Sequence, residues 1–102
     1  MQVSYRKATL KDIADMQSLI APEVESGVIL ARSDDECATN IRSYILAYIG
    51  NELVGFCALH IHTATLAEIR SLIVKEDKRG YKIGKNLVLN SIKEAKALDL
   101  KQ

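Results

Sequence analysis

The segment that decides the fold is EIRSLIVKEDKRGYKIGK, residues 68–85. Residues 68–74 are mostly aliphatic and predict a strand, and residues 79–85 place two glycines at the start of a helical pattern. That pattern continues with small and apolar side chains on one helix face, at Leu87, Val88, Ser91, Ile92 and Ala95. The segment therefore predicts a strand, a charged turn at residues 75–78, a tight turn, and a helix that reaches residues 96–100.

The turn at residues 79–85 has the composition of a phosphate site. A strand–turn–helix junction directs free backbone N–H groups at one point, and the helix dipole adds about half a positive charge there. Gly80 and Gly84 allow a ligand to approach the backbone closely. Four cations lie within eight residues, at Lys78, Arg79, Lys82 and Lys85. A solvated turn would explain the same residues, but the flanking strand and helix together with the cation cluster favour phosphate binding.

Spacing argues against two other nucleotide-binding motifs. The stretch from Gly80 to Lys85 is one residue short of a P-loop, and Asn86 stands where Mg²⁺ coordination needs Ser or Thr. The chain also contains no G-x-G-x-x-G sequence for a dinucleotide fold.

The first third of the chain predicts a strand and two helices. Residues 3–8 alternate as in a short strand, and Thr9 can cap a helix that stops before Pro22. The apolar positions of this helix are Ile13, Met16, Leu19 and Ile20. Residues 22–31 predict a mobile helix–loop segment. Ser33 and Glu36 match a capping box, which predicts a second helix to about residue 42.

The middle of the chain predicts a hairpin and a third strand. Gly50-Asn51 is a two-residue turn between two runs rich in β-branched and aromatic residues. The three predicted strands are residues 44–49, 53–61 and 66–74. The order of elements predicts an α/β (α+β) domain, and the length of the chain allows one domain over residues 1–102.

Composition excludes several classes of function. The net charge is only +1, so no global field attracts nucleic acid or a membrane, and no apolar run is long enough to span a bilayer. The amino terminus lacks the features of a secretory signal, which favours a cytoplasmic location. Cys37 and Cys57 predict free thiols. His60 and His62 share a strand face but lack further ligands, so we expect no metal site.

The junction resembles the cofactor motif of the GNAT superfamily of N-acetyltransferases, Q/R-x-x-G-x-G/A, which precedes the helix after the fourth strand. Arg79, Ile83 and Gly84 fit this motif. Lys82 stands where the family usually has its middle glycine, and Gly80 is common in members. The resemblance implies a GNAT-like acyl-CoA N-acyltransferase fold, with a mixed, mostly antiparallel sheet flanked by helices. It also implies acetyl-CoA as co-substrate, without a metal.

A narrower resemblance is to the acetyltransferase domain of N-acetylglutamate synthases, which act in arginine biosynthesis. It rests on Gly27–Leu30, Arg32-Ser33, Ala58-Leu59, Glu68, Leu72 and Val74. This resemblance implies transfer of an acetyl group to the amine of a small molecule, with L-glutamate as a candidate acceptor.

The resemblance also implies roles for single residues. A bulge in the fourth strand would free a backbone N–H around Leu72, Ile73 and Val74 for the developing oxyanion. Glu68 is the candidate general base, directly or through water, and the alternative is that it only pairs with Arg70 on the same strand face. Arg32 and Arg70 are candidates for binding a substrate carboxylate. The predicted cofactor contacts in the turn are Arg79, Gly80, Tyr81, Lys82, Ile83, Gly84 and Lys85.

Compared with the family, the chain is expected to lack the carboxyl-terminal strands. The exposed edge of the fourth strand, at Ile69, Leu72, Ile73 and Val74, would then favour homo-oligomers or marginal stability. The general acid also cannot be assigned. An alternative to an enzyme is therefore a non-catalytic module that binds acyl-CoA or a protein partner.

Overall fold

The computed structural model describes residues 2–29, 31–63 and 65–98. Its elements follow the predicted order and are β1 (Ser4–Lys7), α1 (Ile13–Glu25), α2 (Asp34–Thr39), β2 (Tyr44–Ile49), β3 (Glu52–Thr63), β4 (Leu66–Val74) and α3 (Ile83–Ala97). Short 3₁₀ turns lie at Leu10–Asp12, Ile41–Ser43 and Glu76–Lys78. The predictions for Leu30 and for the last helical residues, 99–100, lie outside the described residues.

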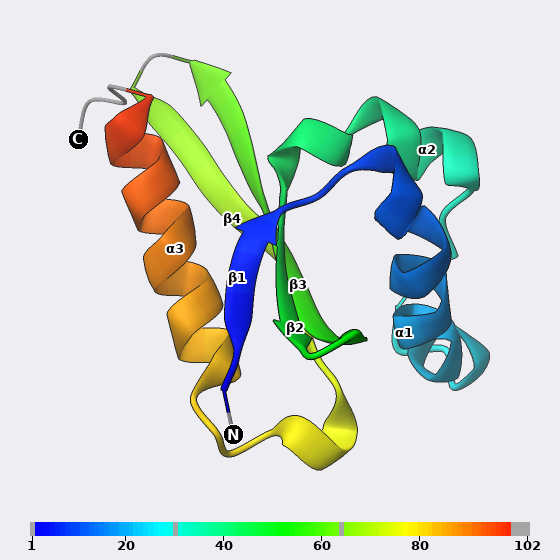
Figure 1. The fold of residues 1–102 in the computed structure, drawn as a ribbon. Helices are drawn as coiled ribbons and strands as arrows, with labels where there is room; N and C mark the ends of the chain where they lie inside the picture. Colours follow the sequence, from blue (N-terminus) through cyan, green and yellow to red (C-terminus); the bar gives the residue numbers. More distant parts are fainter. Residues whose placement is uncertain (1, 30, 64, 99–102) are drawn as a thin grey trace.

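The strands form one sheet in the order β1-β2-β3-β4, and all three ladders in the described part are antiparallel. The predicted hairpin is confirmed, because Ile49 pairs with Glu52 across the turn and Gly50 has a φ of 59°. β3 continues past the end of β2, so its residues 59–63 pair only with β4. Figure 1 shows this β3–β4 ribbon extending beyond the other two strands.

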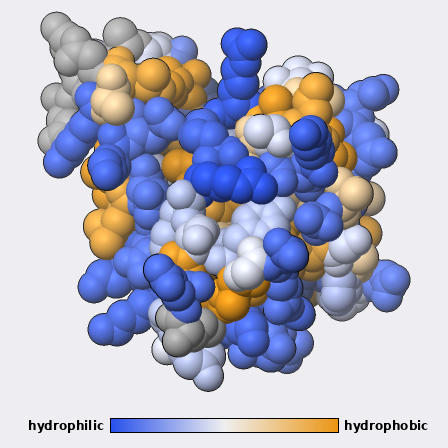
Figure 2. Space-filling view, viewed as in Figure 1, coloured by the Kyte–Doolittle hydropathy of each residue, from blue (hydrophilic) through white to orange (hydrophobic). Residues whose placement is uncertain are grey.

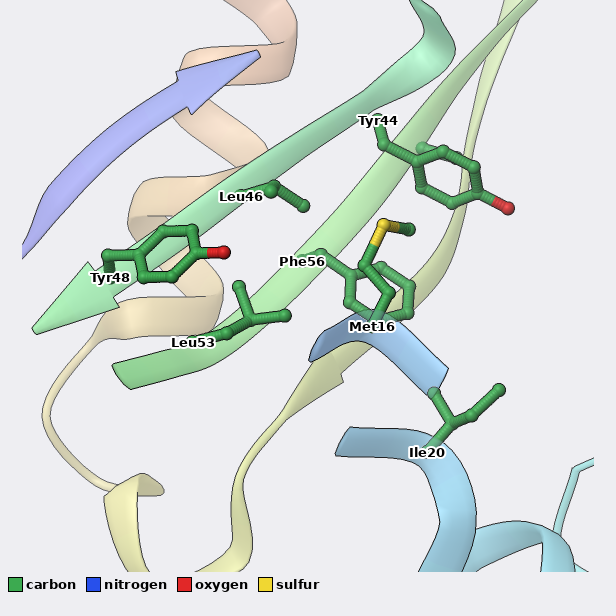
Figure 3. Close-up of a cluster of buried hydrophobic side chains, with 8 residues drawn as sticks. Met16, Ile20, Tyr44, Leu46, Tyr48, Leu53 and Phe56 are labelled. Carbon is green, nitrogen blue, oxygen red and sulfur yellow. The ribbon is translucent and has the colours of Figure 1, made fainter. Parts of the chain in front are cut away.

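The sheet lies between two helical layers, with α3 on one face and α1 and α2 on the other (Figure 1). On the α1 face, Met16 and Ile20 of α1 pack against side chains of β2 and β3 (Figure 3). The strand members of this cluster are Tyr44, Leu46, Tyr48, Leu53, Phe56 and Ala58. Alternate residues point to opposite faces of a strand, so the neighbours of these residues build the second core under α3.

α3 lies close to the sheet because β3 has a glycine beneath it. An added Cβ on Gly55 would stand 2.9 Å from the carbonyl oxygen of Ile73 and 3.2 Å from a methyl of Leu87. The α3-face core contains Ile83 and Leu87 together with Ile45, Ala47, Val54 and Cys57. Across the part of the chain that the structure describes, no helix is both long and apolar enough to cross a membrane.

Two predicted helix ends were wrong. α1 continues through Pro22 to Glu25, although proline removes one backbone donor and crowds the preceding turn. Leu19 and Val24 pack against the core on either side of this proline, so tertiary contacts hold the last turn in place. α2 has the predicted capping box, with the Glu36 amide 3.1 Å from Ser33 Oγ, but it ends at Thr39 and a 3₁₀ turn follows.

The surface has apolar areas on α3 and along β4. Figure 2 shows a mostly hydrophilic face with hydrophobic atoms gathered over α3 and over the α1 and α2 side. Exposed apolar residues of α3 include Leu89 and Ile92. β4 is the edge strand of the described sheet, with Leu72 46% and Ile69 36% exposed, while Ile73 and Val74 are half-buried. Self-association through this edge stays a prediction.

A buried carboxylate ties the start of α1 to the sheet. Asp12 is 4% exposed and accepts two hydrogen bonds from Arg6, at 2.8 and 2.9 Å, and one from the Tyr48 hydroxyl at 3.0 Å. The hydrogen bonds from Arg6 hold the pKa of Asp12 well below its usual range, and burial raises the pKa of Tyr48 to about 12. The charged form of Asp12 is therefore the stable one in the folded protein.

α3 begins at a residue with an unusual backbone. Lys82 is its N-cap, with φ 64° and ψ 18°, in the left-handed region that glycine adopts without strain. Its carbonyl accepts the first bond of the helix, from Asn86 N–H at 3.0 Å. This conformation explains why a glycine is usual at the matching position of the motif.

We predict that Asp12→Asn lowers the free energy of unfolding at neutral pH by about 2 kcal/mol, the size expected for hydrogen bonds to a charged group. Because folding depresses this pKa, the stabilisation is present above the unfolded pKa of about 4 and is lost as the pH falls further. Urea unfolding of both proteins at several pH values measures this, and the difference should shrink in acid. Asp35→Asn, on an exposed residue, is the control. A pH-independent difference would contradict the assignment.

We also predict that Lys82→Gly raises the free energy of unfolding by about 1 kcal/mol, because glycine removes the left-handed strain. Lys85→Gly, three residues along the same helix, should instead lower it by about 0.5–1 kcal/mol, since Lys85 lies inside α3. Thermal and urea unfolding measure both variants. Equal destabilisation by the two changes would show that the Lys82 backbone is not strained in solution.

Candidate functional site

β4 contains a bulge near its centre. Ala58 pairs with Arg70, but Phe56 pairs with Ile73, so β4 has one more residue than β3 over this stretch. Ser71 in this stretch has a φ of 56°. The bulge that the resemblance implied is therefore present, and it lies at Ser71 and Leu72, beginning one residue before the expected stretch of Leu72 to Val74.

The bulged strand has one unpaired edge within the described sheet. Lys75 N–H donates to the Val54 carbonyl at 2.7 Å, so residues alternate between facing β3 and facing the outer edge. Consistent with this, the carbonyl of Val74 accepts a hydrogen bond from Arg79 Nε at 3.2 Å. Backbone groups at the end of β4 therefore point to the outer edge of the sheet, where Arg79 of the following turn also lies.

The predicted phosphate turn lies directly after β4. Gly80 has a φ of 93°, and Lys82 caps α3. The first amides of a helix have no partner inside the helix, so those of Ile83, Gly84 and Lys85 point out of its amino terminus. The Ile83 side chain lies in the core and is 1% exposed, so only its backbone can contact a ligand.

Gly84 leaves a small space beside β4. An added Cβ would lie 3.6 Å from Val74 Cγ2 and 4.0 Å from Leu72 Cδ2, which is ordinary contact. Packing within the chain therefore does not require a glycine at this position. A ligand that approaches the helix amides would use the space that a Cβ fills, which fits a phosphate group.

The cations of the turn have different surroundings. Tyr81, Lys82 and Lys85 are exposed. Arg79 forms a salt bridge at 3.1 Å with Glu23, near the end of α1. Its guanidinium thus connects α1 to the end of β4.

Two cavities lie on the α1 side of β4. One, of about 550 Å³, lies between α1 and the end of β4, and its lining includes Leu19, Glu23, Val74 and Lys75. The other, of about 580 Å³, lies beside the bulge, and its lining includes Arg32, Glu36, Phe56, Arg70, Ser71 and Leu72. We call this second cavity the bulge cavity. Arg32 and Arg70, predicted to bind a substrate carboxylate, therefore line one cavity.

Arg32 is fixed by two hydroxyl groups. Its Nη1 donates to the Tyr44 hydroxyl at 2.7 Å, and its Nη2 donates to Ser71 Oγ at 2.6 Å. Among the residues that the structure describes, no carboxylate forms a salt bridge with Arg32. Its positive charge therefore stays available to an anion in the bulge cavity.

Glu68 lies on the β3–β4 ribbon, outside the lining of the bulge cavity. Its Oε1 is 3.1 Å from His62 Nε2 and 4.0 Å from Arg70 Nε. Glu68 therefore pairs with Arg70, which the sequence analysis gave as the alternative to a catalytic role. Burial is the main cause that lowers the pKa of His60, which is half-buried on the same ribbon. Residues 2–29, 31–63 and 65–98 contain no group of three or more side chains placed to hold a metal ion.

Sequence reasoning missed three residues near the site. The Tyr44 hydroxyl accepts a hydrogen bond from Arg32, a contact that the sequence pattern did not indicate. Ser71 and Glu23 carried no signal, because each acts through a partner 39 or 56 residues away.

Comparison with known proteins identifies the family of this chain. Residues 10–102 match the profile of the acetyltransferase (GNAT) family. An uncharacterised N-acetyltransferase of Chlorobaculum tepidum is 35% identical over 83 residues, covering 81% of this chain and 54% of that protein. An amino-acid acetyltransferase of Shewanella oneidensis is 28% identical over 93 residues, covering 90% of this chain and 21% of that protein. The chain thus spans about half, or about a fifth, of the length of these curated relatives.

Solved structures of similar fold contain coenzyme A. N-acetylglutamate synthase of Neisseria gonorrhoeae, solved with coenzyme A and N-acetyl-glutamate, superposes with a TM-score of 0.89 and 28% identity, over 98% of this chain and 24% of that one. The PaiA N-acetyltransferase of Thermoplasma acidophilum, solved with coenzyme A, has a TM-score of 0.84 and 23% identity, over 98% of this chain and 76% of that one. The fold and the family profile agree, and the chain belongs to the acetyltransferase (GNAT) family.

Proposed function

We propose that this chain binds acetyl-CoA along the outer edge of β4 and transfers the acetyl group to the amine of a small, carboxylate-bearing acceptor. The observation that carries this proposal is the arrangement on one edge strand. A bulge at Ser71–Leu72 lies beside a cavity with two arginines, and the free amides of α3 begin at Ile83, eleven residues after Leu72. L-Glutamate is the candidate acceptor.

The junction supports binding of the pyrophosphate. The amides of residues 83–85, the space beside Gly84 and the exposed charges of Lys82 and Lys85 together suit an anion. Arg79, Gly80 and Tyr81 complete the proposed site. Leu72 and Val74, on either side of Ile73, would present the outer backbone groups of β4 to the rest of the cofactor.

Acetyl-CoA supplies a thioester whose carbonyl carbon the amine attacks, with the C–N bond forming, the C–S bond breaking and the thiolate leaving to take up a proton. The chain supplies the surroundings for this reaction. A backbone N–H of the bulged strand would stabilise the oxyanion, since a bulge releases backbone groups from the ladder. Glu68, through water, would accept the proton that the acceptor ammonium loses.

The bulge cavity supports an acceptor that carries a carboxylate. Arg32 retains its charge, and Arg70 lines the same cavity, so one carboxylate could contact both guanidinium groups. The synthase of Neisseria gonorrhoeae, 28% identical, was solved with N-acetyl-glutamate, which makes glutamate the first acceptor to test. One observation favours a binding module instead, because Glu68 pairs with His62 and Arg70 outside the cavity lining.

We predict that coenzyme A binds the wild-type chain, and that Gly84→Glu weakens binding at least about tenfold, because it places an anion at the proposed phosphate position. Gly84→Ala should also weaken binding while the chain stays folded, because its Cβ has only ordinary contacts. Isothermal calorimetry measures both. Leu89→Glu adds the same charge to an exposed position of α3 and is the control. Equal affinity of Gly84→Glu and Leu89→Glu would remove the phosphate assignment.

We predict that Glu68→Gln lowers kcat by about 100-fold, the usual contribution of a general base, and leaves the KM for acetyl-CoA unchanged. Thiol release in the presence of L-glutamate measures the rate. Glu76→Gln, in the turn after β4, is the control. Wild-type turnover by Glu68→Gln would place the base elsewhere, and coenzyme A binding without turnover by the wild-type chain would favour the binding module.

A further inference from the structure

The backbone of Ser71 is unusual for an edge strand. Its φ of 56° lies in the left-handed region, which serine rarely adopts. The residue also marks the point where β4 gains its extra residue relative to β3. A contact outside the strand must therefore favour this conformation over a regular ladder.

Arg32 supplies such a contact and links three segments. It belongs to the connection between α1 and α2, and it reaches both Ser71 Oγ at 2.6 Å and the Tyr44 hydroxyl at 2.7 Å. Tyr44 is 1% exposed, and its ring meets that of Phe56 edge-on, with centroids 5.6 Å apart. Phe56 pairs with Ile73, on the far side of the bulge. The guanidinium thus joins a rigid part of the core to the bulge.

The same guanidinium faces the bulge cavity. Arginine has five N–H groups, and the two contacts with hydroxyls use two of them. The other charged groups around this cavity are Arg70 and Glu36, and Glu36 Oε1 accepts the Ser33 amide hydrogen at 3.2 Å. The remaining donors of Arg32 can therefore meet an acceptor carboxylate while the bond to Ser71 is kept.

We propose that Ser71 is a positioning residue, whose hydroxyl is held by Arg32 and fixes the bulge of β4 in the form that presents its backbone N–H to the reacting carbonyl. This inference rests on the proposed acetyl transfer for its kinetic consequence. It couples two events at one side chain: a carboxylate that binds Arg32 also orders the group that sets the oxyanion site. A carboxylate on the acceptor should then raise kcat as well as lower KM.

A double-mutant cycle tests the contact without any assay of activity. Ser71→Gly allows the left-handed backbone but removes the hydroxyl, and Arg32→Met keeps the stem but removes the donors. The combined effect of both changes on the unfolding constant should differ at least about threefold from the product of the single effects. Arg32→Lys replaces Arg32→Met if the latter does not fold. Ser4→Gly, in β1, should combine with Arg32→Met independently. Independent effects of Arg32→Met and Ser71→Gly would overturn the proposal.

Measurements of kcat on Ser71 variants distinguish a positioning role of this residue from a merely structural one. Ser71→Asn keeps an acceptor for Arg32 and tolerates a positive φ, so its kcat should stay within about threefold of wild type. Ser71→Gly should lose about tenfold in kcat, with unchanged affinity for coenzyme A. Equal kcat values for the two variants would overturn the positioning role. If the wild-type chain transfers no acetyl group, the proposed function fails, while the cycle still decides whether the Arg32–Ser71 contact holds the bulge.

Discussion

The single extra residue in β4 is the constraint on which the rest of the site depends. In a regular strand, residues 70 and 73 would face opposite sides of the sheet. Because the bulge shifts the register, Arg70 opposite Ala58 and Ile73 opposite Phe56 both face α1. Arg70 can therefore line the bulge cavity while Ile73 packs against the core and Val74 turns toward α3. A shift of one residue in the β3–β4 register would lose both the bulge cavity and the packing of Ile73 against the core.

The start of α3 is placed by the same strand. Gly55 allows the helix to approach the sheet, and Ile83 and Leu87 fill the core beneath it. Their packing fixes the distance between the first amides of the helix and the outer edge of β4. The left-handed Lys82 makes the sharp entry that this packing requires, at a cost in backbone strain. Fold stability therefore favours a glycine at position 82, whereas the proposed phosphate site uses the positive charge of Lys82.

The parts of the fold that neighbours in sequence encode were predictable. The turn at Gly50, the capping box at Ser33 and the strand–turn–helix junction each depend on residues within a few positions of one another. The end of α1 was not predictable, since contacts of Leu19 and Val24 with the core outweigh Pro22. Arg32 and Arg70 could be proposed from the sequence because arginine is suited to bind a carboxylate. The contacts of Arg32 with Tyr44 and Ser71 could not, because residues far apart in the sequence leave no local pattern when they meet in the fold.

The surroundings of Arg32 differ from those of Arg6, Arg70 and Arg79. Arg6, Arg70 and Arg79 each lie within 4.0 Å of a carboxylate, so their charges are at least partly balanced within the chain. Arg32 is half-buried and contacts two neutral hydroxyls instead. Partial burial of a charge without a counter-ion costs free energy, which a bound anion can recover. A cavity that carries this imbalance is therefore suited to bind a carboxylate, while the hydrogen bond from the same guanidinium reaches Ser71 at the bulge.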